Sequence, residues 1–346
     1  MIWLTWRQFR AQAVAAVVIL AAATAYFVAT GLGMHHSYAT DLASCTAQND
    51  CDTLLSQLRY KYDAMFNLAE LLVVAAPALI GIFWGAPLIG RELETGTHQV
   101  AWNQSVTRTR WLAIKLAGVG LASMATAGVL SYLLTWWAGP LDQIDGSRFA
   151  AMTFSTRDIV PLAYAAFAFA LGTIAGLLLR RTIPAMAVTL AVFIGIQVLV
   201  PTMIRPNLLP STTVTYTLDE SSLSQANGIF GQGGSSGDFY MSGLGVSQGA
   251  WVLSSTPVEN SSDQPIPLNA IQSCLPAIGP NGKGGRGGTD FAQVGSCLAH
   301  DNLHESVTYQ PSSHYWPIQW FESGLFLVLT ALLSGACFWW IRRRQN

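Results

Sequence analysis

Six apolar stretches, each of about 20 residues, constrain this chain more than any other feature of its sequence. A helix of that length spans the roughly 30 Å hydrocarbon core of a bilayer, whereas buried helices of soluble proteins rarely reach it without a polar face. Apolar residues make up 51% of the 346 and charged residues only 11%. We therefore predict an all-α transmembrane domain with six helices. The stretches cover residues 11–34, 71–89, 116–137, 159–179, 183–204 and 323–341.

The first ten residues differ from the spans in carrying both aromatic and basic side chains. On a helix, Trp3, Trp6 and Arg10 fall near one face, which is typical of an amphipathic segment lying at the membrane interface. The alternative is that residues 1–10 are simply the polar cap of the first span. A basic start before an apolar run also resembles a cleaved signal peptide. However, the run continues to Met34, so we expect a permanent span.

Lysine and arginine are distributed unequally between the two sides that six spans define. Eleven of the 18 fall in the short segments and tails of one side, and the positive-inside rule assigns that side to the cytoplasm. Both termini are thus predicted to be cytoplasmic. The net charge of −1 gives no indication of a nucleic-acid partner. The eleven are Arg7, Arg10, Arg91, Arg108, Arg110, Lys115, Arg180, Arg181, Arg342, Arg343 and Arg344.

Four of the five cysteines lie in segments predicted to be outside. Cys45 and Cys51 follow the first span, and Cys274 and Cys297 precede the last. Four cysteines permit three pairings, of which the local ones, Cys45–Cys51 and Cys274–Cys297, are the simplest. An oxidising exterior permits both disulfides.

The predicted domain organisation follows from the spans. Residues 11–204 contain the first five helices and a cytoplasmic loop at 90–115, and residues 323–346 contain the sixth helix and a basic tail. Between them, residues 205–322 are too long for a simple connection. Short β-type runs at 212–216, 251–253 and 307–309 alternate there with glycine-rich stretches. We predict a large, partly β extracellular insertion between helices five and six.

Small residues and prolines within the spans indicate how the helices pack. Gly172 and Gly176 have the Gly-x-x-x-Gly spacing that permits close contact between membrane helices. Prolines that kink the spans or mark their ends are tolerated in membrane helices. They stand at positions 77, 87, 161, 184 and 201.

The segment between the second and third spans is compact and charged. Its two acids, Glu92 and Glu94, are the only acids on the side assigned to the cytoplasm. The pattern resembles the type-2 ABC exporter permease family, in which Arg-Glu is followed by Gly-Thr, a Ser/Thr-Arg turn and a lysine that opens the third span. The wider sequence, from Trp84 through Trp111, resembles permeases common in actinobacteria. The matching residues are Arg91, Glu92, Gly96, Thr97, Thr107, Arg108 and Lys115.

This resemblance implies a function and a set of partners. In that family the loop holds a coupling helix that rests on a separate ATPase, here over residues about 91–104, with Arg91, Glu92, Glu94, Gly96 and Thr97 as the coupling residues. The chain has no Gly-x-x-x-x-Gly-Lys-Ser/Thr motif, so ATP and Mg²⁺ are expected only in the partner. The expected assembly has two P-loop ATPase subunits and a second permease chain, the same or related, in a bacterial plasma membrane. The expected activity is export of a drug, antibiotic, peptide or lipid-like substrate. The large segment 205–322 departs from simpler members, which have a short hairpin there.

Two acids near the outer ends of spans are candidates for the substrate pathway. Glu70 and Glu322 lie at the outer ends of the second and sixth spans, where an ionisable residue is a functional candidate by default. Both stand near the predicted boundary, and we favour an interfacial position reached by water over a place in the pathway.

Other functional classes have less support in the sequence. Cys297, His300 and His304 have the spacing of metal ligands, but a disulfide would remove the thiolate, and we predict no metal site. No span carries a metalloprotease motif such as His-Glu-x-x-His, so we expect no enzyme. The remaining alternative is a membrane-anchored sensory or assembly protein presenting residues 205–322, and it leaves the charged 91–111 segment without a role.

Overall fold

The computed structural model describes residues 2–45, 51–96, 107–218, 228–232, 238–242, 246, 249–267, 269 and 303–344. The chain divides into two compact units, which are treated separately below. Unit 1 comprises Met1–Leu208 and Tyr315–Asn346, and unit 2 comprises Leu209–His314. The predicted insertion 205–322 contains all of unit 2, together with the end of the fifth span and the first turns of the last helix.

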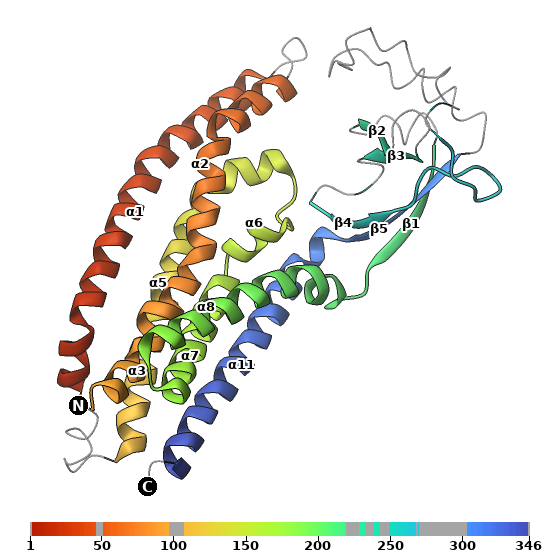
Figure 1. Cartoon of the computed structure of the whole chain (residues 1–346). Helices are drawn as coiled ribbons and strands as arrows, with labels where there is room; N and C mark the ends of the chain where they lie inside the picture. Colours follow the sequence, from red (N-terminus) through yellow and green to blue (C-terminus); the bar gives the residue numbers. More distant parts are fainter. Residues whose placement is uncertain are drawn as a thin grey trace. The chain divides into compact units, whose positions relative to one another are not determined.

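Unit 1 is helical, and six helices of the described part of the chain are long and apolar enough to cross a membrane. This confirms the six predicted spans as membrane-competent helices (Figure 1). The fourth, 159–179, matches α7 to within one residue, and the other five lie within longer helical segments. Residues 2–10 are the first turns of α1, so their position at the interface stays a prediction. The elements are α1 (Ile2–Ser44), α2 (Cys51–Ile80), η1 (Gly81–Gly85), α3 (Ala86–Glu94), α5 (Arg108–Asp145), α6 (Ala151–Thr156), α7 (Val160–Leu179), α8 (Thr182–Leu199), η2 (Val200–Ile204), η3 (Arg205–Asn207) and α11 (Tyr315–Arg344).

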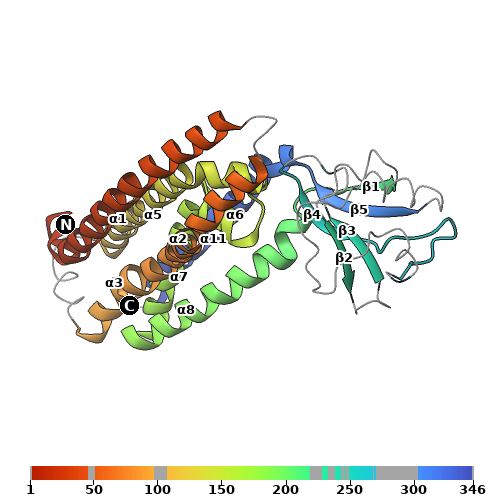
Figure 2. The ribbon, with the colours of Figure 1, turned by 90° about the horizontal axis from the view of Figure 1, so that it is seen from above.

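Helix α7 is the centre of unit 1. It is the most buried of the six spans, and it contacts α2, α3, α5, α8 and α11. Figure 2 shows these neighbours around it. The sequence permits this position because α7 is almost entirely apolar and rich in alanine and glycine, and such residues let neighbouring backbones approach closely.

The closest approach is between α7 and the π-helical turn η1, which joins α2 to α3. A Cβ on Gly81 would lie 2.7 Å from the carbonyl oxygen of Ala168. A Cβ on Gly172 would overlap the Gly81 carbonyl, and one on Gly176 would overlap the Ala86 carbonyl. The Gly-x-x-x-Gly spacing therefore does mark a backbone-to-backbone contact.

Proline in this region frees a backbone carbonyl, which a neighbouring helix then satisfies. Pro87 has no N–H, so the carbonyl of Phe83, four residues earlier, lacks its usual helical donor. The side chain of Gln12 on α1 donates to that oxygen at 2.9 Å. An unpaired carbonyl is costly in hydrocarbon, so this contact stabilises the packing of α1 against η1.

The same arrangement recurs nearer the other end of α1. Pro140 interrupts α5 and frees the carbonyl of Trp136. His35 of α1 lies with Nε2 at 3.1 Å from that oxygen, and its ring stacks on the Trp136 ring with centroids 5.1 Å apart. A carbonyl only accepts, so Nε2 carries the proton. Two side chains of α1 thus bind the two carbonyl oxygens that Pro87 and Pro140 leave without their usual helical donors.

Helices α1, α2 and α5 form a second core. Buried Met34, Phe66 and Trp137 belong to it, and Arg59 of α2 binds Asp145 of α5 at 2.9 Å. Cys45 and Cys51 are paired where α1 ends and α2 begins, as the local pairing predicts. Cys337 is buried and free. The predicted Cys274–Cys297 pair lies outside the described residues.

Unit 2 contains β-structure. An antiparallel sheet has the order β1-β5-β4, and β2 pairs with β3. All three predicted β-type runs fall in strands of the first sheet, with Val214 opposite Val307 and Thr215 opposite Ser306. The side of the membrane on which this unit lies stays a prediction. The strands are β1 (Thr212–Thr217), β2 (Gly228–Gln232), β3 (Asp238–Ser242), β4 (Trp251–Ser255) and β5 (His304–Gln310).

The glycine contact generates a stability prediction. Gly176→Ala places a methyl group against the backbone of α3, which cannot move as a side chain can, and overpacking of this kind costs about 1–3 kcal/mol. We expect a lower unfolding temperature in detergent, measured by the reaction of a thiol dye as buried Cys337 becomes accessible. Gly195→Ala is the matched control, since nothing lies within 4 Å of its Cβ position. Equal stability of the two variants would contradict this contact.

Candidate functional site

Both termini lie at one end of unit 1, together with the segments that carry most of its basic residues. The start of α1, the end of α3, the start of α5, the turn between α7 and α8 and the end of α11 all lie there (Figure 1). Because an even number of helices run in alternating directions, both termini lie at the same end of unit 1. We call this region the basic end, and its core is formed by Ile89, Trp111, Leu112, Leu177 and Ile341.

Glu92 is the first of two acids that join α3 to other spans. Its carboxylate lies 2.6 Å from Nζ of Lys115 on α5, with the Glu92 side chain 13% exposed and the Lys115 side chain 3% exposed. The ammonium also lies over the Trp111 ring, 4.7 Å from its centroid. The sequence predicted Glu92 as a coupling residue, and that role stays a prediction, but its carboxylate binds a lysine of the same chain. Lysine at 115 turns that acid inward because a buried ammonium needs a counter-charge.

Glu94 is the second of these acids, and it reaches α8. Its Oε2 accepts from the backbone N–H of Thr182 at 3.0 Å and from the Thr182 hydroxyl at 2.8 Å. Thr182 is the first residue of α8, where N–H groups have no partner within the helix and the dipole favours an anion. Glu94 therefore caps α8 from another segment of the chain. Sequence spacing gives no sign of this contact.

The remaining motif residues lie at or near the ends of the segment between α3 and α5. Gly96 has φ +72°, a left-handed conformation that glycine adopts at low cost just beyond a helix end. Thr107 is the N-cap of α5, and its hydroxyl accepts from the Arg110 N–H at 3.4 Å. Arg91 is exposed. Thr97 lies outside the described residues.

At the other end of unit 1, Glu322 of α11 forms a buried ion pair with Arg205 of η3. The Arg205 Nε lies 2.9 Å from Glu322 Oε2, and both side chains are fully buried. Tyr164 of α7 donates its hydroxyl to the same carboxylate. The guanidinium also donates to Ser155 Oγ at 2.9 Å and lies over the Phe154 ring. This cluster joins α6, α7, η3 and α11.

Glu70 of α2 belongs to a second buried cluster. Arg157, fully buried after α6, lies 3.4 Å from Glu70 and 3.2 Å from Asp142 of α5. Glu70 is 4% exposed and Glu322 is 0% exposed. The favoured interpretation, that water reaches these acids at an interface, was therefore wrong. Each finds an arginine from a distant part of the chain, and such pairs cannot be inferred from one sequence.

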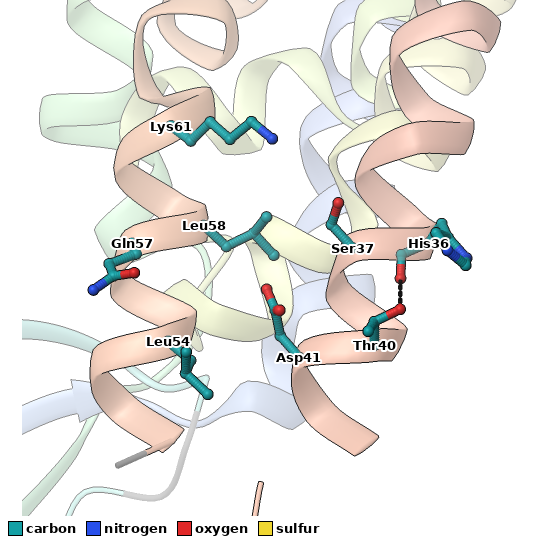
Figure 3. Close-up of a pocket in the computed structure, with 8 residues that line it drawn as sticks. All are labelled: His36, Ser37, Thr40, Asp41, Leu54, Gln57, Leu58 and Lys61. Carbon is teal, nitrogen blue, oxygen red and sulfur yellow. Dashed lines mark hydrogen bonds between the residues drawn. The ribbon is translucent and has the colours of Figure 1, made fainter. Parts of the chain in front are cut away.

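A groove lies between the end of α1 and the start of α2, at the end of unit 1 opposite the basic end. It has a volume of about 410 Å³, and Figure 3 shows Asp41 of α1, Leu58 of α2 and Lys61 of α2 among the side chains that line it. Its lining therefore carries charges of both signs beside apolar leucine.

Apolar spans, internally paired charges and a basic end define a polytopic integral membrane protein whose interior carries structural ion pairs. The chain belongs to the ABC-2 membrane transporter related family, whose model matches residues 17–205, more than half of the chain. It is thus a permease subunit of an ABC transporter and not its nucleotide-binding subunit. Comparisons with curated proteins and with solved structures gave no match.

Family membership decides between the functional classes that the sequence left open. Permeases of this family generally work with a separate ATPase subunit, and this favours a transporter over a sensory or assembly protein. The match covers the first five spans and the coupling segment, and it ends at Arg205, before unit 2. Unit 2 and α11 therefore lie outside the residues that the family model matches.

The buried pair of Arg205 and Glu322 generates a prediction. Glu322→Gln leaves the Arg205 charge buried without its counter-charge, which costs about 3–5 kcal/mol. The double variant Arg205→Met, Glu322→Gln removes both charges, so we expect it to be more stable than Glu322→Gln. Thermal unfolding in detergent measures both.

The control for this experiment is Arg59→Met. Its ion pairs are partly exposed, with the Arg59 side chain 22% exposed, and exposed pairs contribute roughly 1 kcal/mol or less. A double variant less stable than the single one would mean that the Arg205–Glu322 pair acts through something other than mutual charge compensation.

Proposed function

We propose that this permease is the membrane subunit of an ATP-driven exporter, and that the segment from Arg91 to about residue 104 transmits the movement of a separate ATPase. The family supports the permease and its ATPase partner. The outward direction is supported by the resemblance of the 90–115 segment to type-2 exporters. Under this proposal ATP and Mg²⁺ are bound by the partner alone.

The observation that carries the proposal is the double attachment of α3. Glu92 joins it to α5 through Lys115, and Glu94 joins it to the start of α8 through Thr182. Helix α3 also continues from α2 through η1, which packs directly on α7. A displacement of α3 therefore acts on four spans at once, as coupling requires.

Orientation and assembly complete the proposal. The basic end faces the cytoplasm, because its arginines and lysine obey the positive-inside rule, and both termini are then cytoplasmic. Two ATPase subunits contact two permease chains, the same or related, which enclose one pathway in a bacterial plasma membrane. Unit 2 then lies outside the cell.

The substrate is proposed only by class: a drug, an antibiotic, a peptide or a lipid-like molecule. Glu70 and Glu322 are the candidate pathway acids, and their carboxylates already bind Arg157 and Arg205. A direct contact with substrate would have to compete with these ion pairs, so a structural role for both acids has more support. A pathway role for either stays a prediction.

The test separates two steps: docking of the ATPase on the permease, and transmission of its movement to the spans. Arg91→Glu reverses an exposed charge on α3, so we expect less ATPase to copurify from native membranes. Thr182→Val and Thr182→Ala remove the hydroxyl that donates to Glu94, and so weaken the link to α8 without changing any side chain of α3. For these we expect unchanged ATPase copurification, but a severalfold smaller stimulation of ATP hydrolysis relative to the isolated ATPase subunit.

The matched control is Arg342→Glu, which reverses an exposed charge at the same end of unit 1 but on α11. It should leave both quantities unchanged. A wild-type chain that copurifies no P-loop ATPase while folded would refute the proposal. Equal copurification with Arg91→Glu and wild type would place the docking surface elsewhere.

A further inference from the structure

Three side chains of metal-ligand type meet in unit 2. Nε2 of His304 lies 3.2 Å from Oδ1 of Asp263 and 3.7 Å from Oε2 of Glu259, and one ligand atom from each residue lies within 4.8 Å of the other two. Ligands of a tetrahedral zinc ion, at about 2.0–2.2 Å from the metal, lie roughly 3.3–3.6 Å from one another. The three atoms are therefore close to the separation that such an ion needs.

Backbone pairing places two of these ligands without help from an ion. The Glu259 N–H donates to the His304 carbonyl at 2.8 Å, and the His304 N–H donates to the Glu259 carbonyl at 2.9 Å. Residues that exchange both hydrogen bonds are directly opposite each other in an antiparallel pair, and their side chains project from the same face. Glu259 and His304 are thus held side by side at the start of β5.

A tight turn supplies the third ligand. Asn260 Oδ1 accepts from the N–H groups of Ser262 and Gln264 at 2.9 and 3.1 Å, and the turn returns the chain toward His304. Asp263, with φ +56°, lies on this turn, and its side chain is 85% exposed. The cluster is therefore supported by the sheet on one side and accessible to solvent on the other.

The charge of the cluster favours a cation. With a neutral imidazole the two carboxylates leave a charge of −2, which one divalent ion neutralises. A protonated His304 would compensate only half of it. An imidazole nitrogen with two carboxylate oxygens suits zinc-like transition metals, whereas calcium and magnesium prefer oxygen ligands alone.

We propose that Glu259, Asp263 and His304 bind one divalent transition-metal ion of the zinc class, with a remaining coordination position open to water. The sequence pattern considered His304 as a ligand together with Cys297 and His300. Cys297 and His300 lie outside the described residues, and the structure gives His304 partners that precede it by 41 and 45 residues. The site lies outside the residues that the family model matches.

Zinc binding by the full-length chain tests the site. The protein is purified in detergent without a polyhistidine tag, alkylated to block free thiols, stripped with a chelator and titrated with Zn²⁺ alone. We expect one tightly bound zinc per chain by elemental analysis. With Co²⁺ instead, we expect a visible absorption band of low-coordinate metal. Even supporting contacts around metal ligands change affinity about 10- to 100-fold, so Asp263→Asn and His304→Gln should each weaken binding at least about tenfold.

Two variants keep the result decisive. Asp263→Asn changes an exposed side chain and preserves the fold. Its zinc affinity therefore still tests the site when His304→Gln does not fold. His36→Gln, an exposed histidine of unit 1, is the control and should retain full binding. Wild-type protein without stoichiometric zinc, or binding that survives both Asp263→Asn and His304→Gln, would overturn the site. Neither result bears on the coupling segment, which lies in unit 1.

Discussion

Backbone contact between α7 and the η1–α3 segment is the interaction on which the rest of unit 1 depends. In lipid, helices gain little from the hydrophobic effect and associate through close packing. Gly172 and Gly176 allow α7 to approach Gly81 and Ala86 to backbone distance. With α7 held there, α5, α8 and α11 pack around it, and α3 emerges at the basic end in a defined direction.

Satisfaction of polar groups within the protein is the second constraint, and it explains contacts that packing alone does not. Unpaired carbonyls and charges are costly in hydrocarbon. Gln12 and His35 compensate carbonyls freed by prolines, and the buried arginines bind carboxylates on other helices. The contacts that satisfy polar groups of the spans in lipid therefore also join one helix to another.

Helix α8 and its continuation connect the two ends of unit 1. Thr182, at the start of α8, binds Glu94 of α3, and Arg205, just past its end, binds Glu322 of α11. Each end of this rod is held by a charge-assisted contact to a different element. Helix α8 and its continuation thus link α3 at the basic end to α11 at the opposite end of unit 1. Unit 2 is built differently, from strands paired by backbone hydrogen bonds.

The sequence by itself determined the six membrane-competent helices, the β-type runs and the local Cys45–Cys51 pair, because hydrophobic length, strand propensity and short separations are local properties. The coupling role of residues 91–104 stays a prediction. The close helix contact at Gly172 and Gly176 was also predicted, from their Gly-x-x-x-Gly spacing. Only the tertiary structure decided that Glu92 binds Lys115, that Glu94 caps α8 and that Glu70 and Glu322 are buried against arginines. Glu259 and His304 were likewise brought together by strand pairing. Each of these partners is set by how distant segments pack, and no local pattern encodes that packing.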